Sequence, residues 1–492
     1  MLTRVRLPRS SGILLHPTSL PGPNGIGDLG GQAYRFVDFL VAAGQTLWQV
    51  LPLGPPGPGD SPYAGSSAFA GSPLLVSLAV LRQGDDTPGA IRVDYGRVGR
   101  EKAERLRKAH RELRGERREA IERFAAKNAA WLDDFALFTA IKEAQGGAAW
   151  TEWPEPLARH DPDALAVFRK EQLEAYDFHV FVQQAFHEQW HALKKYANER
   201  GVRIMGDVPI FVAHDSADVW AHPDLFRLDE RGQPTEIAGV PPDYFSPTGQ
   251  LWGNPLYRWD VMAERGYRWW VDRFRHLFEL VDAVRIDHFR GFAAHWSVPA
   301  GEETAVNGRW DPGPGAALFN AVRDAVGDLP IVAEDLGTIT PDVHALREEL
   351  GFPGMKVLQF AFGDTPANPY LPHNYEQNAV VYTGTHDNDT TVGWYATLPE
   401  EQRHRVREYL GTDMSDPAWD LIRLALSTVA DTAIVPLQDV LSLESEARMN
   451  TPGRGLGNWS WRYHPDQLQP QIAERLRGLV ERYNRGPAKP GP

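Results

Sequence analysis

Eight short apolar runs, separated by stretches of helical character, constrain the fold more than any other feature of this sequence. They are rich in β-branched residues and almost continuously apolar, which is typical of parallel strands buried on both faces. The runs are Gly12–His16, Thr46–Leu53, Arg203–Val208, Asp282–Asp287, Leu329–Asp335, Lys356–Phe360, Ala379–Thr385 and Thr432–Asp439. Because eight such runs alternate with helices, they predict an α/β fold, namely a (β/α)8 TIM barrel.

Uneven spacing of the runs predicts large insertions between barrel strands. The gap between the second and third runs is far longer than a crossover helix requires. We expect residues from about 54 to 200 to form a largely helical insertion, with two or more long helices within Glu101–Glu143. Residues from about 238 to 257 are dense in Pro and Gly and predict a long loop above the barrel rim. Residues 486–492 predict a disordered tail, and 1–492 is read as a single barrel domain.

Composition narrows the classes of partner. The formal net charge is −14, which does not favour nucleic acid, and the chain has no cysteine, which excludes disulfides, thiolate nucleophiles and Cys-based zinc sites. No apolar run approaches the roughly 18 residues that span a bilayer, and the N-terminal residues lack the pattern of a secretion signal. We expect a cytoplasmic protein, a monomer or a weak homo-oligomer, with neither nucleic acid nor a membrane as partner.

Charged residues gather where the runs end. Asp207 ends the third run, Arg285 and Asp287 end the fourth, Glu334 lies in the end of the fifth, and Asp387 follows the seventh. The carboxyl ends of barrel strands share one rim, and that rim carries the reaction in barrel enzymes. One isolated Asp would more simply cap a helix or bind a loop, but this group of charges at successive strand ends predicts an active site.

Alternation along the fourth run gives two of these residues a chemical relation. Arg285 and Asp287 are two residues apart and point to the same side, and a neighbouring cation favours the ionised form that a nucleophile needs. Partial burial of Glu334 in an apolar strand would raise its pKa, as suits a proton donor at neutral pH. A nucleophilic carboxylate and a protonated carboxyl are the pair that double-displacement glycoside chemistry uses.

Other chemistries have weaker support. The pair His386-Asp387 could also belong to a metal phosphohydrolase, but the remaining histidines lack close metal-ligand spacing. The sequence contains neither a Walker loop nor a GxSxG nucleophile elbow.

Longer motifs around these residues resemble a known family. The segments GDVPIFVAHDSADVW (206–220), AVRIDHFRGF (283–292), VAEDLG (332–337) and YTGTHDNDTTVGWY (382–395) resemble the four signature regions of the α-amylase clan. More narrowly, they are similar to glycoside hydrolase family 77, the amylomaltase or 4-alpha-glucanotransferase family. Residues 10–30, 51–73, 243–257 and 445–462 resemble that family too, so the likeness covers nearly the whole chain.

The resemblance implies roles for individual residues. Asp287 would be the nucleophile, Glu334 the general acid and then base, and Asp387 a third carboxylate that binds sugar hydroxyls. The substrate-binding residues that it implies are Ser61, Tyr63, Asp207, Tyr244, Gln250, Trp252, Arg285, His288, His386 and Asn458. Ala213 replaces the Asn that precedes His214 in many clan members, which removes a possible calcium ligand, so neither metal nor organic cofactor is expected.

The resemblance also implies the reaction. It would be transfer of α-1,4-glucan segments to the 4-hydroxyl of an acceptor glucan or glucose, with intramolecular transfer giving cyclic glucans. The partners would be α-1,4-glucans and maltooligosaccharides. The residues alone leave two alternatives: an α-glucan hydrolase on the same barrel, and a non-catalytic glycan-binding barrel. The second has no need of Arg285 and Asp287 opposite Glu334.

Overall fold

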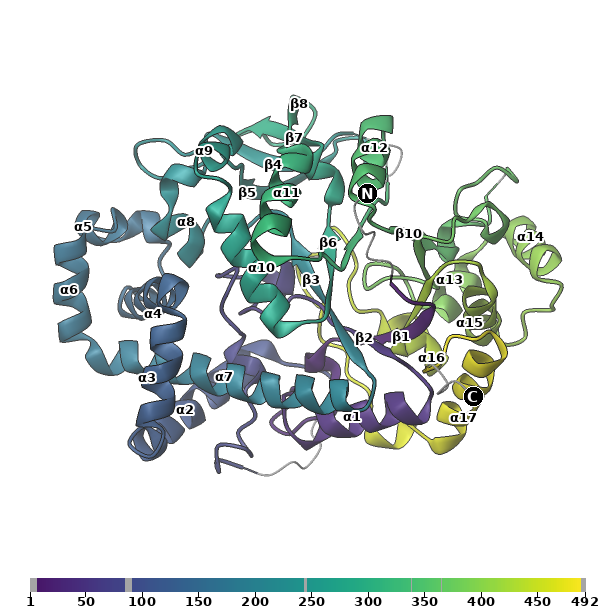
Figure 1. Ribbon diagram of the computed structural model, residues 1–492, viewed down its shortest axis with the longest axis horizontal. Helices are drawn as coiled ribbons and strands as arrows, with labels where there is room; N and C mark the ends of the chain where they lie inside the picture. Colours follow the sequence, from purple (N-terminus) through teal and green to yellow (C-terminus); the bar gives the residue numbers. More distant parts are fainter. Residues whose placement is uncertain (1–6, 85–90, 243–245, 338, 364, 488–492) are drawn as a thin grey trace.

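A computed structural model describes residues 7–84, 91–242, 246–337, 339–363 and 365–487 (Figure 1). Its central sheet has eight parallel strands in the order β10-β11-β12-β1-β2-β3-β6-β9. They are β1 (Ser10–Leu14), β2 (Leu47–Gln49), β3 (Arg203–Pro209), β6 (Ala283–Asp287), β9 (Ile331–Ala333), β10 (Gly354–Val357), β11 (Ala379–Tyr382) and β12 (Thr432–Pro436). Each predicted apolar run overlaps one of these strands, and the prediction of a TIM barrel is confirmed.

The barrel closes between the two outer strands of that order, β9 and β10. The Ala333 N–H donates to the Pro353 carbonyl at 2.9 Å, and the Met355 N–H donates to Asp335 Oδ1 at 2.7 Å. Asp335 is buried and also pairs with Arg347 at 3.3 Å. This carboxylate therefore joins the last two strands and is not free for chemistry.

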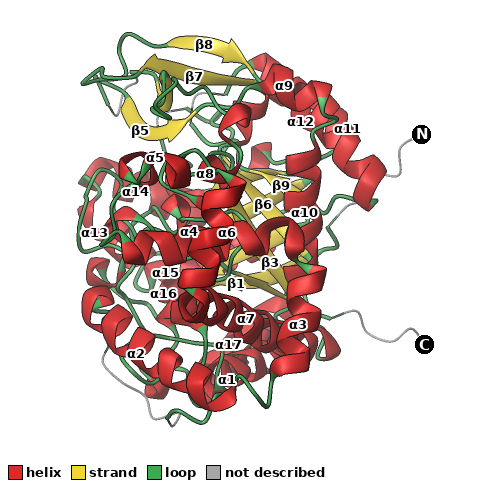
Figure 2. Ribbon diagram, turned by 90° about the vertical axis from the view of Figure 1, so that its left-hand side faces the viewer, coloured by secondary structure: helices red, strands yellow, loops and turns green. Residues whose placement is uncertain are grey.

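Helices surround the sheet (Figures 1 and 2). α1 packs against α7 and α17, and α10 packs against α7 and α11, which forms part of the outer ring of the barrel. The helices are α1 (Gly31–Ala42), α2 (Tyr95–Leu113), α3 (Arg118–Lys127), α4 (Ala129–Ala144), α5 (Glu155–Ala158), α6 (Pro162–Glu171), α7 (Leu173–Glu199), α8 (Ala217–Ala221), α9 (Trp259–Glu264), α10 (Arg268–Leu280), α11 (Gly315–Val326), α12 (Pro341–Leu350), α13 (Thr391–Thr397), α14 (Glu400–Leu410), α15 (Pro417–Ser427), α16 (Leu437–Val440) and α17 (Pro470–Arg482).

The helical insertion between β2 and β3 contains α2 to α6 and leads into α7. The expectation of two or more long helices within 101–143 is met by α2, α3 and α4. Its treatment as a separate subdomain stays a prediction. None of the helices that the structure describes is long and apolar enough to cross a membrane.

A second sheet stands beyond one end of the barrel (Figure 2). It is antiparallel, in the order β5-β4-β7-β8, and comprises β4 (Glu236–Val240), β5 (Gln250–Pro255), β7 (Ala294–Pro299) and β8 (Arg309–Pro312). The prediction of a long loop over 238–257 is therefore wrong at both ends. Pro and Gly suggested irregular backbone, whereas pairing with β7, far along the chain, holds β4 as a strand.

Two contacts fix this sheet above the end of β3. Asn254 Nδ2 donates to the Val212 carbonyl at 2.8 Å, and the Tyr257 hydroxyl donates to the Ile210 carbonyl at 2.8 Å. Both carbonyls belong to the segment that directly follows β3. The second sheet therefore lies on the side of the barrel to which its strands deliver their carboxyl ends.

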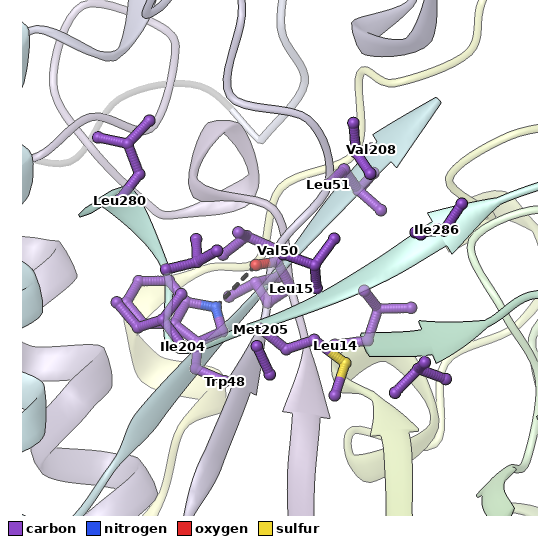
Figure 3. Close-up of a cluster of buried hydrophobic side chains, with 14 of the residues drawn as sticks. Leu14, Leu15, Trp48, Val50, Leu51, Ile204, Met205, Val208, Leu280 and Ile286 are labelled. Atoms are coloured by element: carbon purple, nitrogen blue, oxygen red, sulfur yellow. Dashed lines mark hydrogen bonds between the residues drawn. The ribbon is translucent and has the colours of Figure 1, made fainter. Parts of the chain in front are cut away.

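Apolar side chains fill the space around β1, β2, β3 and β6 (Figure 3). The indole of Trp48 is fully buried and donates Nε1–H to the Leu15 carbonyl at 2.8 Å, so its one polar atom is satisfied. The labelled members of this cluster are Leu14, Leu15, Trp48, Val50, Leu51, Ile204, Met205, Val208, Leu280 and Ile286. Close packing here fixes the strands whose ends carry the charged residues.

Arg485 anchors the chain after α17 to the start of β1 and the loop before β12. Its side chain is fully buried. Its guanidinium donates to backbone carbonyls of two segments, one at the start of β1 and the other between the end of α15 and β12. The acceptors are the carbonyls of Ser10, Leu426, Thr428, Ala430 and Asp431. Of the predicted tail, residues 486 and 487 follow this anchor, and 488–492 lie outside the described residues.

We predict that Arg485→Ala lowers the thermal midpoint by about 3 °C or more, because buried carbonyls lose their donor without gaining water. Differential scanning calorimetry at a fixed scan rate measures this shift. The exposed Arg423 on α15 gives a matched control, and Arg423→Ala should leave the midpoint nearly unchanged. Equal midpoints for the two variants would contradict the anchoring role.

Candidate active site

A buried guanidinium organises the carboxyl ends of β3 and β6. Register pairs Asp207 with Arg285, and Pro209 with Asp287. Arg285 donates to both oxygens of Asp207, at 2.9 and 2.7 Å, and its other terminal nitrogen lies 2.9 Å from Asp287 Oδ1. Arg285 and Asp207 are buried, whereas the Asp287 side chain is 31% exposed. The expected contact between Arg285 and Asp287 is therefore present, and the accessible member is the predicted nucleophile.

Polar contacts continue from Asp207 through Tyr63 to His386, in the loop after β11. The Tyr63 hydroxyl donates to Asp207 Oδ2 at 2.8 Å and lies 3.4 Å from His386 Nδ1. The Tyr63 and His386 rings stack with centroids 5.0 Å apart. Ser61 caps the short helical turn that carries Tyr63, since its Oγ accepts the Tyr63 N–H at 3.2 Å. Ser61 thus contacts the backbone of Tyr63 and helps to position its ring.

Glu334 follows β9 and is held by the end of the neighbouring strand, β6. Its Oε2 accepts the His288 N–H at 2.7 Å, and its Oε1 accepts the Leu336 N–H at 2.8 Å. His288 has a φ of 52°, in the left-handed region that side chains other than Gly rarely adopt. This turn directly after Asp287 points the His288 N–H at Glu334. One strand end therefore carries the predicted nucleophile and fixes the predicted acid/base.

The surroundings of Glu334 raise its pKa. Burial raises the pKa of Glu334 to about 7, and the negative charge of Asp287 acts in the same direction. The Arg285 charge and the two backbone N–H donors oppose this rise without cancelling it. The sequence-based expectation that burial raises the pKa of Glu334 agrees with this result. Near neutral pH, Glu334 can hold a proton while Asp287 remains paired with a guanidinium.

Burial fixes the protonation of neighbouring groups as well. It raises the pKa of the Tyr63 phenol well above its ordinary value, so this hydroxyl keeps the proton that it donates to Asp207. Burial also raises the pKa of Asp207, and the charge of Arg285 opposes it. The pKa of His288 is lowered to about 3, chiefly by burial, so its ring is neutral at physiological pH.

Asp387 lies in the loop after β11, and its side chain is 47% exposed, compared with 31% for that of Asp287. Its Oδ1 lies 3.4 Å from His386 Nε2 and accepts Asn450 Nδ2–H at 2.6 Å. Asn450 was not predicted from the sequence. Asn450 lies within 445–462, a segment that resembles the family, but the resemblance points to Asn458 in that segment.

The second sheet brings an aromatic side chain to the same region. Trp252 on β5 is 37% exposed, and its ring meets the His288 ring edge to face with centroids 4.7 Å apart. Its Nε1–H donates to Gln250 Oε1 at 3.1 Å. Trp252 therefore lies beside His288, directly after β6, and Gln250 contacts Trp252; their roles as substrate contacts stay predictions. Tyr244 lies outside the described residues.

Asn458, His214 and Asp389 form hydrogen bonds outside the group around Asp287 and Glu334. The Asn458 amide bonds to the backbone of its own loop, at Thr451 and Arg454. His214 Nε2 lies 2.7 Å from the Gly232 carbonyl. Asp389 accepts the Ser445 hydroxyl at 2.7 Å, and the choice of Asp387 as the third carboxylate stays a prediction. Within the described ranges, no group of three or more His, Asp or Glu residues is arranged to hold a metal ion.

Comparison with known proteins gives this site a family. A family model described as 4-alpha-glucanotransferase matches residues 15–469. The 4-alpha-glucanotransferase of Thermus thermophilus is 51% identical over 495 residues, covering 97% of this chain and 99% of that protein. That of Synechocystis is also 51% identical, covering 97% and 98%. The solved structure of amylomaltase from Streptococcus agalactiae in complex with acarbose has a TM-score of 0.94 at 40% identity, covering 97% of this chain and 100% of that one.

These matches favour transfer between α-glucans over the hydrolase and the non-catalytic binding barrel. The chain therefore belongs to the 4-alpha-glucanotransferases, the enzymes of glycoside hydrolase family 77.

Proposed function

We propose that this enzyme moves α-1,4-glucan segments by a retaining double displacement, with Asp287 as nucleophile and Glu334 as acid/base. The observation that carries the proposal is the arrangement at the ends of β6 and β9. Asp287 is paired with Arg285 at 2.9 Å, and the turn that follows it holds Glu334, whose pKa is raised to about 7. One group is ready to attack while the other holds a proton.

The first step forms a glucosyl-enzyme. An Asp287 oxygen attacks the anomeric carbon of the donor, and the glycosidic C1–O bond breaks. Glu334 gives its proton to the leaving 4-oxygen, so that the departing glucan leaves as a neutral alcohol. The product is a β-linked ester between the retained glucan segment and Asp287.

Formation of that ester changes the acid/base group. The negative charge of Asp287, which helps to raise the pKa of Glu334, disappears when the carboxylate becomes an ester. Arg285 then remains as a nearby positive charge that favours ionised Glu334. Glu334 can therefore take the proton from an acceptor 4-hydroxyl, whose oxygen attacks the anomeric carbon and displaces Asp287.

Asp387 and the polar chain through His386, Tyr63 and Asp207 would bind sugar hydroxyls around the reacting ring. Carboxylate and imidazole groups at fixed positions suit this task because they can strengthen contacts as the ring distorts. Trp252 supports the same reading, since an exposed indole face can stack on glucose and exclude water from the ester. Gln250, Ser61 and His288 would orient these contacts.

The partners follow from this chemistry. α-1,4-Glucans and maltooligosaccharides would act as donors, and the 4-hydroxyl of a glucan or of glucose would act as acceptor. When the bound segment supplies its own terminal 4-hydroxyl, the same second step closes a cyclic glucan. No step requires an organic cofactor, because proton transfer and nucleophilic attack are both carried by side chains.

Incubation with maltotriose tests transfer directly. We expect glucose together with longer maltooligosaccharides, while the total number of reducing ends stays nearly constant, because each broken linkage is replaced by a new one. Chromatography of the products and a reducing-sugar assay measure the two quantities in one reaction. A steady rise in reducing ends would instead indicate hydrolysis.

Asp287→Ala should abolish both transfer and hydrolysis, by several orders of magnitude in kcat, because no other group can form the ester. Asp389→Asn provides a matched control at the same end of the barrel, since Asp389 bonds to Ser445 and Thr390. The control should retain most of the activity. Substantial turnover by Asp287→Ala would refute its assignment as nucleophile.

The pH dependence of kcat/KM should show an alkaline limb near pH 7. Because the pKa of Glu334 is raised to about 7, its protonated fraction falls as pH rises through that value, and the rate should fall about tenfold per pH unit above it. Glu334→Gln should still bind maltooligosaccharide, turn over very slowly and lack this limb. An unchanged limb in Glu334→Gln would assign it to another group.

A further inference from the structure

A short segment in the C-terminal part of the chain forms hydrogen bonds with both the side chain and the backbone of Asp387. The segment is Arg448–Asn450, directly after a helical turn at Ser445–Ala447, and it makes three hydrogen bonds to His386 and Asp387 in the loop after β11. Asn450 Nδ2 donates to Asp387 Oδ1 at 2.6 Å, an Arg448 terminal nitrogen donates to the Asp387 carbonyl at 2.6 Å, and the Asn450 N–H donates to the His386 carbonyl at 3.0 Å. Side chain and backbone of Asp387 are thus held by the same segment.

Hydrogen bonds that do not involve Asp387 also hold the segment Arg448–Asn450 in place. Arg448 Nε donates to the Asn450 carbonyl at 2.7 Å, which bridges the two ends of the segment. Met449 between them is buried, and its carbonyl accepts the Trp459 N–H at 2.7 Å. Since these bonds fix the backbone on both sides of Asn450, its amide is already placed when it meets the carboxylate.

The chemistry of the contact favours one orientation of Asp387. An amide N–H binds Oδ1, and within the part of the chain that the structure describes, Oδ2 has no hydrogen-bond partner. A neutral amide adds no charge near Asp287 and Glu334, so it can orient the carboxylate without disturbing their protonation. Bonds from a neutral donor to a charged acceptor are also among the stronger ones in proteins.

We propose that Asn450 is a positioning residue for the transfer reaction: its amide holds Oδ1 of Asp387 so that Oδ2 faces the sugar hydroxyls. The inference rests on the proposed role of Asp387. Asn450 acts through that carboxylate and need not touch the substrate. Loss of the amide would let Asp387 rotate, which weakens a contact that matters most when the sugar ring is distorted.

Asn450→Ala tests this with steady-state kinetics on a maltooligosaccharide. We expect kcat to fall about 10- to 100-fold, with KM changing far less, because a bond to a charged group is lost from a contact strengthened in the transition state. Ser445→Ala is the matched control, since it removes a bond from the preceding helical turn to the nearby Asp389. Calorimetry checks that both variants fold. A kcat for Asn450→Ala equal to that of the control would overturn the proposal.

Asn450→Asp separates positioning from simple loss of structure. It preserves shape but sets a second carboxyl against Asp387 Oδ1, where the nearby charged or titratable groups are His386, Arg448 and Tyr63. One proton shared by the two carboxyls can replace the amide donor, and rising pH removes it. Activity relative to wild type should therefore fall as pH rises from 5 to 8. A ratio independent of pH would contradict positioning by a donor at this site.

The variant Asp387→Ala distinguishes failure of the proposed role of Asp387 from failure of the positioning role of Asn450. If Asp387→Ala is active, the proposed function of Asp387 fails and the inference fails with it. If Asp387→Ala is inactive while Asn450→Ala matches Ser445→Ala, only the positioning role is refuted. Loss of activity in both Asp387→Ala and Asn450→Ala, with a pH-dependent Asn450→Asp, is the expected result.

Discussion

The buried guanidinium of Arg285 is the interaction on which the active site depends. It reaches the two oxygens of Asp207 on one strand and Asp287 on its own strand, so two negative charges share one positive charge inside the barrel. Removing the guanidinium would leave two neighbouring carboxylates without a compensating charge, and Asp207 is buried, which is strongly unfavourable. The geometry of the rim is therefore enforced by the same interaction that keeps Asp287 ready for attack.

The barrel turns this ion pair into a catalytic arrangement. Parallel strands deliver their carboxyl ends to one rim, and the turn at His288 connects the nucleophile's strand to Glu334 through a backbone bond of 2.7 Å. Because Asp287 contributes to the raised pKa of Glu334, the two groups are coupled: a change in the charge of one alters the proton affinity of the other. That coupling lets a single carboxyl serve first as acid and then as base.

The barrel strands and the pairing of Arg285 with Asp287 were predictable from the sequence, because both depend on residues close together in the chain. The apolar runs mark the strands because both faces of a parallel sheet are buried, and two-residue alternation places Arg285 beside Asp287. The strand β4 was not predictable in the same way, since it pairs with β7, more than fifty residues further along the sequence, and β5 joins the sheet only by pairing with β4. Asn450 lies 63 residues from Asp387, and no spacing rule joins them. Long-range pairing of this kind is decided by tertiary structure.

The buried ion pair has a consequence for the behaviour of the enzyme on heating. Hydration of charged groups becomes less favourable as temperature rises, because ordering water around an ion carries an entropic penalty. The free energy needed to keep the buried pair Arg285 and Asp207 out of water therefore decreases in warm conditions, whereas the attraction between them persists. A rim organised by buried charges is thus better suited to hot surroundings than one organised by neutral hydrogen bonds, without any change in the residues that perform the chemistry.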